Sequence, residues 1–358
     1  MIEYIHESSS ALQRTLDSNE QNIVESVEQF RRKGIKHIIL TGMGSSYTSA
    51  MMAFPIMRIY SDIPVHVIPS TELSYYIGSL ISKETVVLNI SRSGERGWVV
   101  EGLKQCLKEG ALCIAVTGVE ESSLARTAPI QWITQEGQEA SFPKTKSVIT
   151  CSGILMRLAL ALGKPGDVSM KDQLSALKSM PEKIMKITES LDPQIQKMIP
   201  FIANHSTFVI CGTGSNYGTA LEAAIKLQET TDITSLADDT GNFFHGPLAP
   251  LDSSWLLIQL THSSDVNLSL QLIDLAKKIG SHSLCITEKG VDIGKHCDHN
   301  IKIPVEVNQM MASLAYLPVI QLINFYLAIE LGKNPDRPEA AVSILNAILP
   351  PGHEEPDF

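Results

Sequence analysis

The feature of this sequence that most constrains its fold is an internal repeat. The segment HIILTGMGSSYTSA, which begins at His37, aligns with TFVICGTGSNYGTA, which begins at Thr207, 170 positions later. At the same offset VVLNISRSGE from Val86 falls on LLIQLTHSSD from Leu256, and further along LCIAVTG faces LCITEKG. Three matches in one order predict a chain built from two copies of one unit.

Each half alternates short apolar runs with longer segments of helical spacing. The runs HIIL, VHVI, TVVLNI and LCIAVT are rich in β-branched residues and are typical of buried strands. Strands that alternate with helices predict a parallel sheet covered by helices on both faces. We therefore expect an α/β chain with two tandem doubly wound domains. The expected boundaries are residues 1–165 for a first domain with an N-terminal helix, 166–195 for a linking helical segment, and 196–358 for a second domain with a C-terminal tail.

The charge and the apolar segments of the chain exclude two classes of partner. The formal net charge is −10 and no block of consecutive basic residues occurs, so we expect no nucleic-acid binding. The N-terminal residues lack the pattern of a secretory signal. The most apolar stretch, residues 312–331, contains Pro318, Gln321, Asn324 and Glu330, which favours a buried helix over a membrane span.

The cysteines indicate a reducing compartment. Six cysteines are scattered without a CxxC pair, a pattern that fits reduced thiols in the cytoplasm better than a disulfide framework or a zinc site. Cys113, Cys211 and Cys285 lie in strand-like runs and are expected in the core. The HCDH run at residues 296–299 is compatible with metal ligands but is interpreted as a polar loop. We expect no metal or cofactor.

Two glycine- and hydroxyl-rich loops follow strands of the first half. In doubly wound sheets ligands bind outside the carboxyl ends of the strands, where serine hydroxyls and helical N–H groups suit a small anion such as phosphate. The structural alternative is that these serines only cap helices. A dinucleotide site is disfavoured, because GMGSSY does not complete GxGxxG and a Walker motif is absent. The candidate binding residues are Gly44, Ser45, Ser46, Ser91, Arg92, Ser93, Gly94 and Arg96.

The candidate chemistry lies in the second half, which has THSSD where the first half has SRSGE. That copy of the phosphate site is either lost or has another role. Glu222, Lys226 and Glu229 recur at spacings of four and three and therefore share one helix face. They form either a surface stripe with a modest salt bridge or an acid–base site in which Glu229 moves a proton between two sugar carbons. His245 is placed on a turn and is a candidate for assisting sugar-ring opening.

In this order the motifs TGMGSSYTSA, SRSGE, LExAxKLxE, HGPLAPLD and NPDRP resemble the sugar isomerase (SIS) domain family. More closely, they resemble the isomerase half of glucosamine-fructose-6-phosphate aminotransferase and its stand-alone relatives. The resemblance implies that Ser46, Ser91 and Ser93 bind a sugar phosphate and that Glu229 shuttles the proton. It also implies a homodimer in which His245 acts from its own or the partner subunit. Lys144, in the run KTK, falls near the ligand in relatives, and Glu222 and Lys226 support the sugar site there.

The departures from the family pattern favour some of the family's activities over others. Arg96 replaces a threonine that contacts phosphate in relatives, and no glutaminase domain precedes the first repeat. The position of the synthase's Schiff-base lysine is Ser343 here. An amino sugar phosphate brings its own nitrogen, so deamination needs no enzyme lysine. We expect an isomerase or deaminase that acts on a hexosamine 6-phosphate. A fructosamine-6-phosphate deglycase and a non-catalytic phosphosugar sensor are the alternatives.

Overall fold

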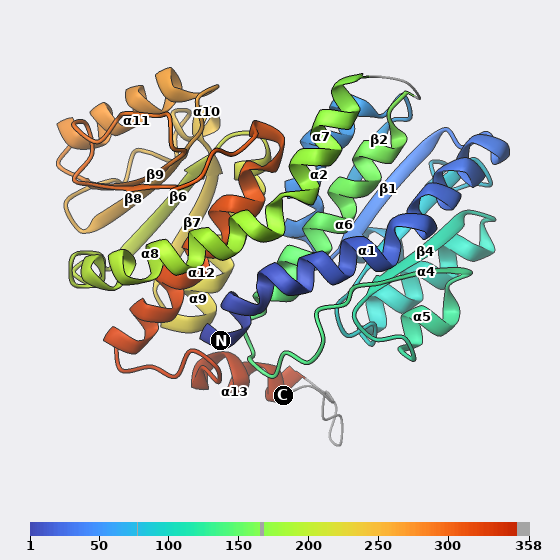
Figure 1. Cartoon of the computed structure of the whole chain (residues 1–358). Helices are drawn as coiled ribbons and strands as arrows, with labels where there is room; N and C mark the ends of the chain where they lie inside the picture. The colour runs from blue at the N-terminus through green and yellow to red at the C-terminus, as the bar shows by residue number, and fades with distance from the viewer. Residues whose placement is uncertain (77, 165–167, 349–358) are drawn as a thin grey trace. The chain divides into compact units, whose positions relative to one another are not determined.

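The computed structural model describes residues 1–76, 78–164 and 168–348 (Figure 1). Its strands form two five-stranded sheets in which every paired strand is parallel to its neighbour. The strands of the first sheet are β1 (His37–Gly42), β2 (Val65–Pro69), β3 (Thr85–Ile90), β4 (Leu112–Thr117) and β5 (Ile130–Ile133). Those of the second are β6 (Thr207–Gly212), β7 (Thr234–Asp239), β8 (Trp255–Thr261), β9 (His282–Thr287) and β10 (His299–Lys302).

The two sheets have the same strand order. The first runs β2-β1-β3-β4-β5, and the second, read from its far edge, runs β7-β6-β8-β9-β10. Each strand of the second sheet therefore takes the place of the strand five earlier in the chain. This correspondence confirms the predicted α/β class with two tandem doubly wound domains.

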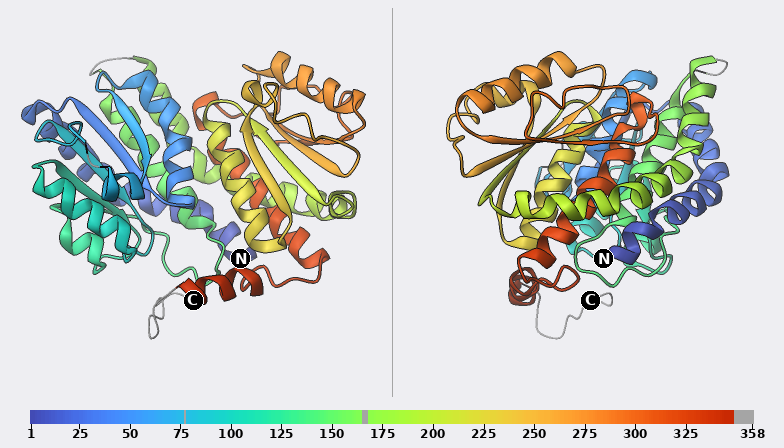
Figure 2. Two further views of the ribbon diagram at one scale, coloured as in Figure 1. Left: turned by 180° about the vertical axis from the view of Figure 1, so that it is seen from behind. Right: turned by 60° about the vertical axis from the view of Figure 1, so that its left-hand side comes forward.

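Helices connect the strands and cover both faces of each sheet (Figure 2). In the first half of the sequence these are α1 (Ile2–Lys33), α2 (Ser45–Tyr60), α3 (Ser70–Tyr75), α4 (Gly97–Lys108), α5 (Ser123–Thr127), α6 (Lys146–Leu162) and α7 (Val168–Lys178). In the second half they are α8 (Met180–Ala203), α9 (Ser215–Thr231), α10 (Thr240–Phe243), α11 (Val266–Lys278), the short 3₁₀ helix η1 (Gln309–Met311), α12 (Ala312–Glu330) and α13 (Glu339–Ile348).

The inner strands of the two sheets are buried on both faces, which explains why they read as continuous apolar runs. These strands are β1, β3, β4, β6, β8 and β9. On one face of the first sheet Ile39 and Val87 pack against Leu103 of α4 in a fully buried cluster. In the second sheet the corresponding cluster joins Val209 to Leu272 of α11. The predicted core cysteines, Cys113, Cys211 and Cys285, are all inaccessible to solvent.

The chain divides into two compact units. The first-half unit comprises Ser10–Gln138 and Lys146–Pro181, and the second-half unit comprises Met1–Ser9, Glu139–Thr145 and the chain from Glu182 onward. Two short segments from the first half of the sequence thus belong to the second-half unit. The predicted linking segment 166–195 contains α7 and the first part of α8, while residues 165–167 lie outside the described residues. The predicted domain boundaries stay a prediction.

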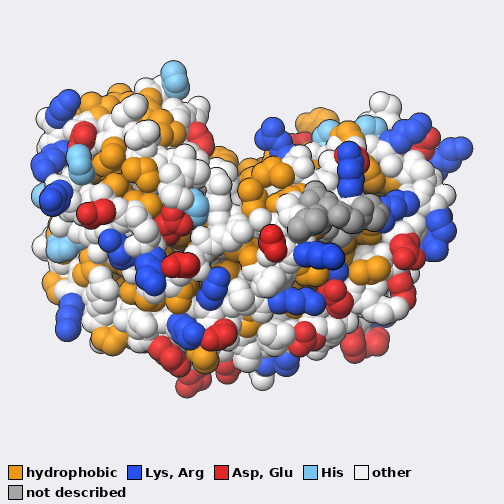
Figure 3. All heavy atoms as spheres, turned by 45° about the horizontal axis from the view of Figure 1, so that its top comes forward, with side chains coloured by type: hydrophobic (Ala, Val, Ile, Leu, Met, Phe, Trp, Pro, Cys, Tyr) orange, Lys and Arg blue, Asp and Glu red, His pale blue; other side chains and the backbone are white. Residues whose placement is uncertain are grey.

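The most apolar helix and the surface charges agree with the expectations from composition. α12 is long and apolar enough to cross a membrane, yet most of it is buried inside the protein, as predicted for a core helix. Figure 3 shows acidic and basic side chains interspersed on the face that it presents.

In the HCDH run His296 pairs with Asp274, with 2.9 Å between Nδ1 and Oδ1. Asp298 accepts a hydrogen bond from the Ser283 N–H.

Candidate active site

The two loops singled out in the first half meet at the point of the sheet where ligands bind in this topology. In the order β2-β1-β3-β4-β5 successive connections run in opposite directions from β1 and from β3, and the crevice between their carboxyl ends is the usual ligand site. The TGMGSS loop follows β1, and the SRSGE loop follows β3. The fold therefore brings these loops together on adjacent strands. We call them the phosphate cradle, defined by residues 43–46 and 91–94.

The first cradle loop leads into a helix whose N-cap residue is not a serine. α2 begins at Ser45, and its N-cap residue is Gly44 in a left-handed conformation with φ of 53°. Glycine at this position supplies no capping side chain. Ser45 and Ser46 are half-buried, and no hydrogen bond of the Ser46 hydroxyl is found within the described part of the chain. The Ser46 hydroxyl thus lies at the start of α2 without serving the capping role that the structural alternative assigned to it.

Hydrogen bonds hold the second cradle loop in one conformation. Ser91 N–H donates to the Val116 carbonyl at 3.0 Å, and Ser91 Oγ accepts from Gly94 N–H at 3.2 Å. The Arg92 carbonyl accepts from both Thr117 Oγ1 and Gly118 N–H at 3.0 Å.

The second hydroxyl of the loop, Ser93, is only half-buried. It accepts a long hydrogen bond of 3.4 Å from Glu95 N–H. Arg96 is half-buried and stands at the N-cap position of α4.

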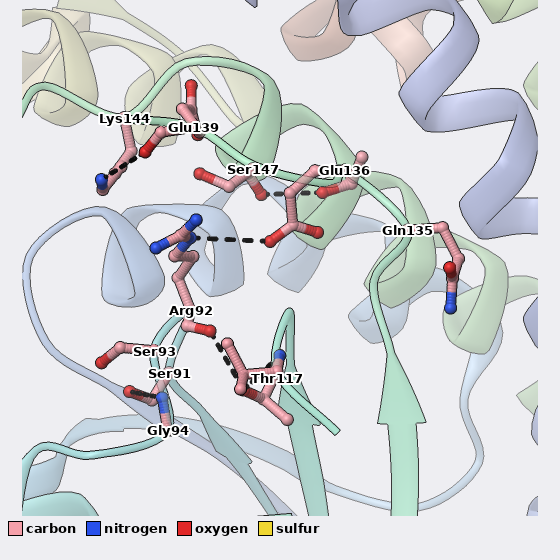
Figure 4. A network of polar contacts seen from close by, with 12 residues as sticks. Ser91, Arg92, Ser93, Gly94, Thr117, Gln135, Glu136, Glu139, Lys144 and Ser147 are labelled. Carbon is pink, nitrogen blue, oxygen red and sulfur yellow. Dashed lines mark hydrogen bonds and ion pairs between the residues drawn. The ribbon is translucent and has the colours of Figure 1, made fainter. Parts of the chain in front are cut away.

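A buried ion pair lies beside this loop and was missed in the sequence. Arg92 Nε is 3.8 Å from Glu136 Oε1, and the exposed fractions of the two side chains are 15% and 1%. Figure 4 shows the Arg92 guanidinium turned toward Glu136 and away from Gly94. Glu136 follows β5 in the polar run TQEGQEAS. Its position just past the carboxyl end of a parallel strand was the signal that could have marked it.

The equivalent loops of the second half hold a carboxylate of their own. Asp265 accepts hydrogen bonds from Thr213 Oγ1 and from His262 N–H, the latter at 2.8 Å. His262 Nε2 in turn lies 2.7 Å from Glu288 Oε2. Burial raises the pKa of Asp265 even though these donors oppose the shift. A fixed negative charge between the two loops opposes the binding of a phosphate there.

The three charged residues of α9 form a buried cluster rather than a surface stripe. Lys226 Nζ lies 2.6 Å from Glu229 Oε2 and 3.5 Å from Glu222 Oε1. Glu222 and Lys226 are 0% and 1% exposed, whereas 26% of the Glu229 side chain reaches solvent. One cation therefore serves two carboxylates, and only Glu229 is open to a ligand.

Burial and charge set the protonation of this cluster. Burial raises the pKa of Glu229, and the nearby Lys226 charge offsets only part of that shift. Burial would lower the pKa of Lys226, but the attraction of Glu229 and Glu222 outweighs it and leaves the net shift upward. Lys226 is thus held charged while the Glu229 carboxyl is brought closer to neutral pH, as a group that both takes and returns a proton requires.

The segment Glu139–Thr145 adds charged groups to the second-half unit. Lys144 Nζ donates to the carbonyls of Glu139 and Ser141 at 2.9 Å (Figure 4). The buried Glu139 carboxylate accepts from Thr145 N–H and Oγ1 at 2.6 Å. The charge of Lys144 also lowers the pKa of Glu229, so Lys144 acts on the α9 cluster. Glu139 was missed in the sequence.

His245 lies apart from these contacts. It is exposed on the turn after α10, where its N–H donates to the Asn242 carbonyl at 2.9 Å. Among the described residues no hydrogen bond or ion pair of its imidazole is found. Its predicted role in ring opening therefore stays a prediction.

Comparisons with known proteins agree with this architecture. The SIS domain model matches residues 33–161 and 201–331. The chain is 27% identical over 346 residues to the isomerizing glutamine–fructose-6-phosphate aminotransferase of Thermococcus kodakarensis, an alignment that covers 94% of this chain and 56% of that protein. The chain thus spans about half the length of the curated relatives it matches.

Two solved structures share the fold over nearly the whole chain. Tagatose-6-phosphate ketose/aldose isomerase from Escherichia coli superposes with a TM-score of 0.80 at 20% identity, covering 93% of both chains. Glucosamine-6-phosphate deaminase from Thermotoga maritima superposes with a TM-score of 0.74 at 23% identity, covering 94% of this chain and 96% of that one. At these identities the likeness shows the fold.

Proposed function

Because this chain belongs to the SIS domain family, we propose that it is an enzyme that binds a hexosamine 6-phosphate and moves a proton between the first two sugar carbons. The observation that carries the proposal is the α9 cluster, in which burial raises the pKa of the partly exposed Glu229 beside a buried lysine. The similarity to the aminotransferase and the deaminase supports the substrate class.

The proposed reaction begins with the open-chain aldehyde of the amino sugar. Glu229 takes the proton from C2 while the C1 oxygen gains a proton from solvent, and the C1–O and C2–N groups become an enaminol. The same carboxyl returns the proton to C1 while the nitrogen gives up one proton to solvent, which leaves a C2=N imine. Water adds to the imine carbon and ammonia leaves, giving the ketose phosphate. The substrate supplies the nitrogen, so the scheme needs no enzyme lysine at the position of Ser343, which the resemblance matches to the synthase's Schiff-base lysine and which is exposed on α13.

The other predicted residues receive roles from this scheme. The hydroxyls of Ser46, Ser91 and Ser93 and the Arg92 guanidinium bind the phosphate, with Gly44, Ser45, Gly94 and Arg96 shaping the cradle. Lys226 orients Glu229 through their 2.6 Å hydrogen bond, Glu222 keeps Lys226 charged, and Lys144 supports the same cluster. His245 assists ring opening, in its own subunit or across a homodimer. We also propose a cytoplasmic location, in keeping with six free cysteines.

Ammonia release tests this proposal directly. Purified protein is incubated with glucosamine 6-phosphate beside Glu229→Gln, with the surface variant Glu189→Gln on α8 as the matched charge control. We expect release by the wild type and the control and none by Glu229→Gln. Wild-type activity that survives in Glu229→Gln would refute the assignment of the proton shuttle. Silence of the wild type here, with amino acid released from a fructosamine 6-phosphate, would replace the deaminase by the deglycase. Binding without turnover of either compound would leave the sensor.

A further inference from the structure

Glu136 is a buried carboxylate that the proposed reaction does not use. Its side chain is 1% exposed, whereas Arg92 at 3.8 Å is 15% exposed. Glu136 is therefore closed to solvent, whereas Arg92, in the second loop of the phosphate cradle, is partly exposed to it. A buried ion pair is weak evidence for stability, because desolvation of two charges offsets much of their attraction. Stability alone therefore does not account for a buried charge at Glu136.

The glycine beside Glu136 leaves space for its carboxylate. Gly118 lies directly beside it, and a Cβ built on Gly118 would collide with Glu136 Oε1 and come within 2.8 Å of Cδ. The same Gly118 donates its N–H to the Arg92 carbonyl at 3.0 Å. Residues at the end of β4 and after β5 thus fix both ends of Arg92: Thr117 and Gly118 hold its backbone, and Glu136 attracts its guanidinium (Figure 4).

An arginine anchored in this way has a defined orientation before any ligand binds. The guanidinium carries five N–H donors in a rigid fork, so one edge can face a carboxylate while another edge meets an anion. Holding the side chain in place reduces the rotamer entropy that would otherwise be lost on binding. Arginine tethered by a buried carboxylate is therefore better prepared for phosphate than the same arginine alone.

We propose that Glu136 is a positioning residue of the phosphosugar site, which holds the Arg92 guanidinium in the orientation that receives the substrate's phosphate. This inference rests on the proposed function, since it takes residues 43–46 and 91–94 as the phosphate site. This inference and a purely Coulombic argument predict opposite changes in anion affinity when Glu136 is removed. Removing a carboxylate near a phosphate site should tighten anion binding if charge alone mattered, whereas loss of the tether should weaken it.

Titration calorimetry with sorbitol 6-phosphate tests the proposal, because this open-chain sugar phosphate has no carbonyl and cannot react. We expect Glu136→Gln to weaken binding about five- to tenfold, because the Arg92 side chain loses the ion pair that orients it and must be ordered on binding instead. Glu120→Gln, which removes an exposed charge from the same unit, should leave binding within about twofold of wild type. Glu136→Asp keeps the charge but shortens its reach, so it should weaken binding as well.

A double-mutant cycle shows whether Glu136 acts through Arg92. In the Arg92→Gln background Glu136→Gln should change the dissociation constant less than about twofold. In steady-state kinetics Glu136→Gln should raise KM with kcat within about twofold. Tighter binding by Glu136→Gln, wild-type binding by both Glu136 variants, or full additivity with Arg92→Gln would overturn the role of Glu136 alone. No binding by wild type, or binding unaffected by Ser93→Ala, would refute the phosphate site itself, and the role of Glu136 with it.

Discussion

Lys226→Met removes the buried cation of the α9 cluster while keeping most of the side chain's volume. In the wild type its Nζ lies within 3.5 Å of Glu222, which is inaccessible to solvent, and within 2.6 Å of Glu229. Breaking a buried pair from one side typically costs about 3–5 kcal/mol. The variant should therefore lose more stability than almost any surface change.

Proton uptake sets an upper limit on that loss. A carboxyl deprived of its cation can bind a proton instead, and at pH 7 this costs about 3.7 kcal/mol, because about 2.7 pH units at about 1.36 kcal/mol each separate pH 7 from the ordinary glutamate pKa. At pH 5.5 the same limit is about 1.6 kcal/mol. The folded variant then binds more protons than its unfolded chain, so its stability falls as pH rises. We expect a deficit of about 3 kcal/mol at pH 7, close to this limit, of which about 2 kcal/mol is recovered at pH 5.5.

Urea unfolding of wild type and Lys226→Met at the two pH values, followed by circular dichroism, measures this difference. Lys197→Met on α8 is the matched control, because Lys197 is exposed in the same unit, and it should cost less than about 0.5 kcal/mol at either pH. A deficit for Lys226→Met below about 1 kcal/mol at pH 7, or one equal at both pH values, would contradict the buried cluster.

Three further outcomes are expected. Glu229→Gln should lower kcat at least about 100-fold, the usual range for a lost general base, in a variant whose circular dichroism spectrum matches that of the wild type. Gly94→Ala should destabilise the chain by more than about 1 kcal/mol in urea unfolding, because Gly94 has φ of 67° and the new Cβ would lie 2.5 Å from Ser122 Cβ. For Asp265, burial raises the pKa, so the wild type should lose stability as pH rises through that raised pKa; in Asp265→Asn this part of the pH slope should vanish.

The fold was largely predictable because the same succession of strand and loop motifs occurs twice in the sequence. The aligned segments at His37 and Thr207 became β1 and β6, and the segments at Val86 and Leu256 became β3 and β8, at equivalent places in the two sheets. Apolar runs buried on both faces are a strong local signal. Helical spacing also placed Glu222, Lys226 and Glu229 on one face, though it could not show that this face is buried.

The missed residues depend on contacts distant in sequence. Glu136 pairs with Arg92 only because β5 and β3 end at the same edge of one sheet, and glutamate in a polar loop is ordinarily a solvated residue. Glu139–Thr145 belongs to the second-half unit. No local sequence pattern indicates this. Asp265 aligns with Glu95, which instead accepts hydrogen bonds from Ser123, so one repeat position serves two different contacts.

The most direct test of the central claim is hydrogen exchange at the sugar carbons. Wild type and Glu229→Gln are incubated with glucosamine 6-phosphate in deuterium oxide, and deuterium at C2 of the remaining substrate and at C1 of the product is measured by nuclear magnetic resonance. Proton transfer through Glu229 predicts product and, wherever the Glu229 carboxyl exchanges its proton with solvent before returning it, deuterium at these positions with the wild type, and neither product nor deuterium with the variant. Product formation and deuterium exchange in Glu229→Gln at the wild-type rates would contradict it.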